Sequence, residues 1–240
     1  NRTKGMVAAV LVVATSAVSA MPLDLTLSGG SEFTTGDTGF EGNDILGDGW
    51  TLRNDASISV EDAPAGDPIR LDFYFLGSES GWTNRLNVDF MGSTGTAVED
   101  NSQPMLDPAE LLFSVTAPGT GGSSISLDSM ISFDLREGSR GTVFAGGGGT
   151  SAMASIAFAY LSCIPASPAD VSCSNTTTPS NRVLFALDDG GAGPDDNHDD
   201  FVGYIEATVV PLPGAAWLFG TALLVLAGFN SRKRRRPLTA

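Results

Sequence analysis

Residues 131–136 read ISFDLR, and their pattern decides the fold class of this chain. The apolar residues Ile131, Phe133 and Leu135 alternate with polar ones, so one face of an extended strand is expected to be buried and the other to meet water. The segment 72–75, DFYF, alternates in the same way. A period of two indicates a β-strand, because side chains on a helix recur every 3.6 residues.

Short segments of this kind recur along the chain and are separated by Gly, Asp, Asn, Ser and Pro. The candidate strands are 23–27, 50–60, 69–76, 85–91, 111–116, 123–127, 130–136, 152–161, 182–187 and 201–209. No helical period is sustained between residues 21 and 208. We therefore predict an all-β domain over residues 21–209, an antiparallel β-sandwich of jelly-roll-like type.

The N-terminus has the features of a secretory signal peptide. Arg2 and Lys4 precede an apolar run over residues 6–14, and Val18 and Ala20 supply the small residues of a cleavage site. We predict that residues 1–20 are removed and that the following domain is exported across the inner membrane.

The C-terminus predicts a transmembrane helix. Residues 215–229 carry no charge, and Leu212 extends the apolar run to about eighteen residues, or roughly 27 Å as a helix. Five cations follow it, namely Arg232, Lys233, Arg234, Arg235 and Arg236. Because positive clusters stay in the cytoplasm, the domain before this helix is expected on the outer side of the membrane.

This C-terminal arrangement resembles the sorting signals of the PEP-CTERM group, in particular the VPLPA-CTERM variant. Val210, Pro211, Leu212 and Pro213 match the motif, and Gly214 stands where Ala is usual. The resemblance implies a bacterial envelope protein whose sorting signal, residues 210–236, is cut by an exosortase, a membrane-embedded cysteine transpeptidase. Residues 237–240 would form a short tail. Such proteins occur mostly in Gram-negative species that make exopolysaccharide.

Cys163 and Cys173 are the only cysteines of the chain. In an oxidising compartment, two cysteines ten residues apart predict one local disulfide. The alternative, a metal or redox pair, lacks both the CxxC spacing and a nearby histidine.

The predicted exported part, residues 21–213, is strongly acidic. It holds 28 acidic residues against six arginines and no lysine, a net charge of −22. Such a surface repels nucleic acid and attracts divalent cations or basic partners, so a role in nucleic-acid binding is excluded.

The densest acidic segment, residues 188–200, suggests a calcium site. Its oxygen-bearing side chains are Asp188, Asp189, Asp195, Asn197, Asp199 and Asp200, besides Asp196. Calcium prefers six to eight oxygen ligands of this kind. The residues at 195, 197 and 199 have EF-hand spacing, but Asp200 stands where Gly is needed and residues 201–209 indicate a strand. We therefore expect a β-loop calcium site, the alternative being a solvated acidic hairpin.

Two segments of the domain also resemble stretches found in the PEP-CTERM group. Residues 188–200 resemble an Asp/Asn-rich segment before the sorting signal, and residues 76–86 resemble a stretch of the β-rich domains, with Ser80 for Ala and Trp82 for Tyr. These likenesses imply a shared architecture and no particular activity.

Enzymatic signatures are weak in this sequence. His198 is the only histidine, there is no GxSxG motif, and the acidic residues form no recognisable catalytic pair. We predict a non-enzymatic structural protein of the cell surface or exopolysaccharide matrix. The alternative is a carbohydrate-binding module that stacks sugars on Trp50 or Trp82, and a polysaccharide hydrolase ranks third.

Overall fold

The computed structural model describes residues 20–36, 45–61, 64–99, 103–136, 138–147, 154–190 and 198–210. Most of the predicted signal peptide and the whole predicted membrane helix lie outside these ranges. In the described ranges, no helix is long and apolar enough to span a bilayer.

The described chain is all-β, as predicted, and every strand pairing is antiparallel. The largest sheet has nine strands in the order β3-β4-β13-β15-β16-β6-β9, with β1 beside β16 and β14 beside β13. Their bounds are β1 Met21–Pro22, β3 Ser31–Thr34, β4 Thr51–Asn54, β6 Pro68–Gly77, β9 Glu110–Pro118, β13 Ser155–Leu161, β14 Ser174–Asn175, β15 Arg182–Asp188 and β16 Phe201–Val209.

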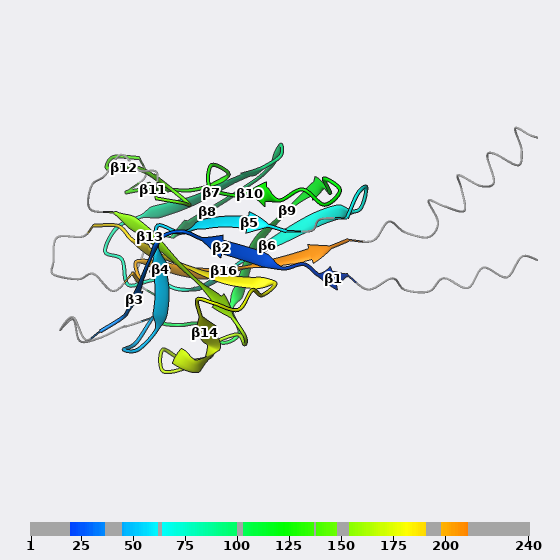
Figure 1. Ribbon diagram of the computed structural model, residues 1–240. Coiled ribbons are helices and arrows are strands. Elements are labelled where there is room, and N and C mark those ends of the chain that lie inside the picture. Colours follow the sequence, from blue (N-terminus) through cyan, green and yellow to red (C-terminus); the bar gives the residue numbers. More distant parts are fainter. Residues whose placement is uncertain are drawn as a thin grey trace, which may run out of the picture. The chain divides into compact units, whose positions relative to one another are not determined.

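Two smaller sheets complete the fold (Figure 1). The four-stranded sheet has the order β12-β11-β7-β8, and the three-stranded sheet has the order β10-β5-β2. Their bounds are β2 Leu25–Ser28, β5 Ser57–Val60, β7 Asn84–Phe90, β8 Ser93–Glu99, β10 Ile125–Ser126, β11 Ile131–Leu135 and β12 Gly141–Phe144. A single 3-10 turn, η1, covers Val171–Cys173.

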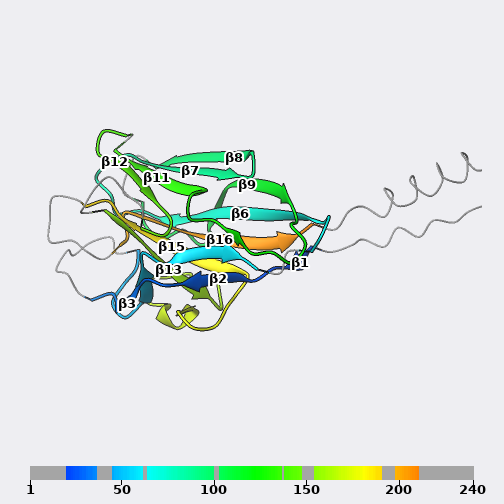
Figure 2. The ribbon, with the colours of Figure 1, turned by 45° about the horizontal axis from the view of Figure 1, so that its top comes forward.

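The main core lies between the nine-stranded sheet and the two smaller sheets. Strand β6 contributes Phe73 and Phe75, and strand β11 contributes Ile131, Phe133 and Leu135, all of them buried. Figures 1 and 2 show the four-stranded sheet stacked over β6 and β16. The alternation seen in residues 131–136 therefore points its apolar side chains into this core, which is an arrangement consistent with a β-sandwich.

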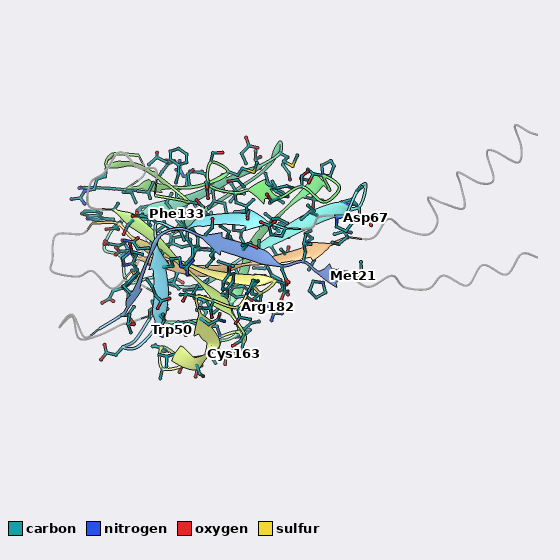
Figure 3. All side chains as sticks on the ribbon, in the orientation of Figure 1. Met21, Trp50, Asp67, Phe133, Cys163 and Arg182 are labelled. Atoms are coloured by element: carbon teal, nitrogen blue, oxygen red, sulfur yellow. A yellow bond between two sulfur atoms is a disulfide. The ribbon has the colours of Figure 1, made fainter. Side chains whose placement is uncertain are left out.

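A second apolar cluster covers the other face of the nine-stranded sheet. It holds Trp50, which is fully buried and donates from Nε1 to the Pro168 carbonyl oxygen at 2.7 Å. Pro168 belongs to the loop closed by Cys163 and Cys173, which are paired as predicted, with their Cα atoms 5.0 Å apart. This loop therefore packs against Trp50 (Figure 3, where Trp50 and Cys163 are labelled).

Two strand predictions need correction, and the structure adds strands that were not predicted. The segment 50–60 forms two strands, β4 and β5, which belong to different sheets, because Asp55 turns the chain with a φ of 55°. The segment 123–127 forms only the two-residue strand β10. Strands β1, β3, β8, β12 and β14 were not expected.

Candidate functional site

The two segments that stand out in the sequence, 76–86 and 188–200, meet in space at one end of the nine-stranded sheet. Strand β16 lies between β15 and β6, with Phe201 opposite Leu187 and Val202 opposite Gly77. Because all these pairings are antiparallel, β6 and β15 both end where β16 begins. The loops that follow β6 and β15 are therefore neighbours.

Asp189 is the centre of a buried hydrogen-bond network at this junction. Its Oδ2 accepts from Ser80 Oγ at 2.7 Å and from Asn84 Nδ2 at 2.9 Å. Asp189 and Ser80 are each 1% exposed, and Asn84 is fully buried. Since a buried carboxylate is costly unless its oxygens accept hydrogen bonds, Ser80 and Asn84 make this burial tolerable.

The other described aspartates of the segment accept hydrogen bonds from backbone amides. These bonds run from Gly190 N to Asp188 Oδ1 (2.7 Å), from Ile45 N to Asp199 Oδ2 (3.2 Å) and from Asp189 N to Asp200 Oδ2 (2.7 Å). Asp188 and Asp199 are buried, whereas Asp200 is half-buried. The two ends of the acidic segment are thus held in fixed positions.

Backbone carbonyl groups of the segment are held as well. Ser78 Oγ donates to the Asp200 carbonyl oxygen at 2.7 Å, and the Glu79 amide donates to that of Asp199 at 2.9 Å. On the other side, Arg140 Nη1 donates to the Gly190 carbonyl oxygen at 2.9 Å. Ser78, Glu79 and Arg140 therefore hold the two described ends of the acidic segment.

The predicted calcium ligands fall into two groups. Asp188, Asp189, Asp199 and Asp200 are described, whereas Asp195 and Asn197 lie outside the described residues. Among the residues that the structure covers, no group of three or more His, Cys, Asp or Glu side chains is arranged to hold a metal ion. Residues 201–209 form strand β16, as predicted, and this strand stands where an EF-hand would have a helix.

His198 makes a contact that the sequence did not predict. Its Nε2 lies 2.8 Å from Ser155 Oγ at the start of β13, and its ring lies 4.9 Å from that of Phe33. The contact joins the end of the acidic segment to strand β13 of the nine-stranded sheet.

The structure separates the two candidate sugar-stacking residues. Trp50 is 0% exposed, so its proposed role as a stacking platform is wrong. Trp82 is half-buried, and the guanidinium carbon of Arg140 lies 3.5 Å from the centroid of its ring. A cation therefore already occupies one face of the Trp82 ring.

Sequence reasoning missed several residues of this junction. Asn84 and Arg140 were not predicted as site residues, and Ser80 was noted only for a resemblance. No sequence pattern indicated a role for Arg140, because its contact with Gly190 depends on how the sheets are stacked. For Asn84, a polar residue at the first position of an otherwise alternating strand was a usable signal.

Comparison of the chain with family models, with curated proteins and with solved structures gave no match.

Proposed function

We propose that this chain is an exported envelope protein that an exosortase releases from its membrane anchor to the cell surface or exopolysaccharide matrix. In this proposal residues 21–209 are a jelly-roll-like β-sandwich with a structural, non-enzymatic role. The observation that supports the proposed export is the disulfide between Cys163 and Cys173. Disulfides persist in oxidising compartments and are rare in the cytosol.

The acidic end of the sheet supports a further part of this proposal, stabilisation by calcium. Asp188, Asp189 and Asp199 are buried at 7%, 1% and 1% exposure, in a part of the chain with a net charge of −22. Close carboxylates repel one another, and a divalent cation would offset that repulsion. Asp195 and Asn197 would complete the ligand set with Asp199 and Asp200.

The carbohydrate-binding alternative is favoured by one observation only. Trp82 is half-exposed and carries Arg140 over its ring, which gives a mixed aromatic and cationic surface. Trp50 gives no support, because it is buried.

The intact mass of the protein tests release from the membrane. Protein from cells with the exosortase should lack roughly the last thirty residues, whereas protein from exosortase-deleted cells should retain them and stay in the membrane fraction. The full-length mass in both strains would reject processing. Two titratable thiols in the exported domain would remove the structural support for export.

A further inference from the structure

Two exposed arginines and a tryptophan converge at the turn between β11 and β12. The guanidinium carbons of Arg140 and Arg136 lie 3.5 and 5.7 Å from the Trp82 ring centroid. Residues 21–213 contain six arginines and no lysine. A third of the cationic side chains of an acidic domain therefore gather around one indole ring, which we call the Arg–Trp patch (Trp82, Arg136 and Arg140).

Toward the part of the chain that the structure describes, the two arginines keep donors for a ligand. Within that part, Arg140 bonds to the carbonyl oxygens of Asp189 and Gly190 through Nη1, which is one of its three nitrogens. The Arg136 side chain forms no hydrogen bond or ion pair with any described residue. Because a guanidinium has five N–H donors, both side chains can bind an acceptor from outside the domain.

Described residues beside the two arginines make backbone hydrogen bonds. The Gly138 amide donates to the Leu135 carbonyl oxygen at 3.1 Å, and the Ser139 amide donates to that of Arg136 at 3.1 Å. Arg136 has a φ of 49° and Gly138 a φ of 82°, so both adopt the left-handed conformation of a tight turn. Trp82 is positioned by its own amide, which donates to Ser80 Oγ at 2.9 Å.

We propose that the Arg–Trp patch binds a carboxylate-bearing sugar of a polysaccharide. The planar guanidinium matches the two oxygens of a carboxylate, and such charge-assisted hydrogen bonds are about twice as strong as neutral ones. The exposed part of the indole offers an apolar surface to the sugar ring. Repulsion from the remaining acidic groups is largely screened beyond about 8–10 Å at physiological salt. This inference rests on the proposed association with polysaccharide and names the chemistry of that association.

Binding of an oligogalacturonate to the full chain tests the proposal, with the carboxyl-reduced form of the same oligomer as the neutral control. The acidic oligomer should bind more tightly than the neutral one, and added salt should weaken its binding. Arg136→Gln should weaken it about tenfold, the loss of one charge-assisted contact. Arg53→Gln, which changes the net charge equally on strand β4, should leave it unchanged.

Three results would overturn the proposal: equal binding of the two oligomers, equal effects of Arg136→Gln and Arg53→Gln, or no binding of either oligomer. Circular dichroism of each variant shows whether the fold is retained. Release from the membrane is judged separately by the intact mass, so failure of the patch and failure of the proposed export can be told apart.

Discussion

Asp189 shows how a single acidic residue can belong to the interior of this domain. The sequence placed it among six carboxylates, and nothing there distinguished it from the other five. In the structure it is 1% exposed and accepts hydrogen bonds from Ser80 and Asn84. The partners are more than a hundred positions away in the chain, which is why local sequence could not show the difference.

Asp189→Ala should therefore destabilise the domain strongly. The change removes the acceptor of the shorter hydrogen bonds of the Ser80 hydroxyl and the Asn84 amide, which keep only the longer ones to the Trp82 carbonyl oxygen (3.1 Å) and to Ser80 Oγ (3.2 Å). We expect a cost of about 1–3 kcal/mol in the free energy of unfolding. Urea denaturation measures this, with Asp24→Ala, an exposed acidic position, as the control expected to change stability by less than about 0.5 kcal/mol. Equal effects of the two variants would show that the network contributes nothing.

The raised pKa of Tyr204 leads us to expect a loss of stability at alkaline pH. Burial, reinforced by the nearby Tyr74 hydroxyl and the Glu206 carboxylate, raises the pKa of Tyr204 from 10.0 to about 12. Its neutral form is thus favoured in the folded state, and this stabilisation is complete below pH 10 and is lost as pH rises through about 12. Tyr204→Phe should flatten the decline of unfolding free energy across this window, by about 2 kcal/mol in total. Identical slopes for the two proteins would contradict the shifted pKa.

Among the elements, strands in which large apolar residues alternate with polar ones were predictable, and strands without that alternation were not. Residues 201–209 and 131–135 form strands almost where the alternation predicted them. Strand β8, STGTAVE, has no large apolar side chain, and it forms along the available edge of β7. The break between β4 and β5 did carry a signal, because Asn54 and Asp55 are turn-forming residues.

Gly203 is a position in β16 where any side chain should be costly. A β-carbon there would press on the Tyr74 carbonyl oxygen and lie 2.5 Å from Phe185 Cζ. Gly203→Ala should lower the free energy of unfolding by about 1–3 kcal/mol through overpacking. Gly36→Ala is a matched control, because its β-carbon would meet open space and its φ is not in the left-handed region. Thermal unfolding of both variants decides whether the close approach is real.

The loop closed by the Cys163–Cys173 disulfide should increase the free energy of unfolding of the domain. Cys163→Ser opens the loop whose Pro168 carbonyl accepts from the Trp50 indole, and single disulfides contribute about 2–4 kcal/mol. The variant should therefore unfold at a lower denaturant concentration than the oxidised protein. The reduced wild-type protein is the control and should match the variant. An unchanged midpoint after reduction would show that the loop needs no covalent closure.

For the whole molecule, the class of fold follows from the sequence but the arrangement of its strands does not. The alternation of apolar and polar residues indicates which face of a strand is buried. It does not indicate which other strand lies beside it. The candidate site depends on that second kind of information, since segments 76–86 and 188–200 meet only because β6 and β15 flank β16. A resemblance singled out residues 76–86 and a high density of acidic side chains singled out residues 188–200, but only the topology brings the two segments together.

The acidic charge of the whole domain leads to the last prediction, that calcium stabilises the fold. A ligand that binds only the folded state adds RT ln(1 + [L]/Kd), about 2.7 kcal/mol at a hundredfold excess over Kd, which corresponds to roughly 5–10 °C in Tm. Calcium should raise the Tm by this amount, and sodium at equal ionic strength should not. The double variant Asp195→Asn with Asp199→Asn should abolish the difference, whereas Asp24→Asn with Asp67→Asn, which removes the same charge elsewhere, should keep it. If the wild-type protein responds equally to the two salts, the buried aspartates are held by Ser80, Asn84 and the backbone amides alone, and the remaining charge is a property of the solvated surface.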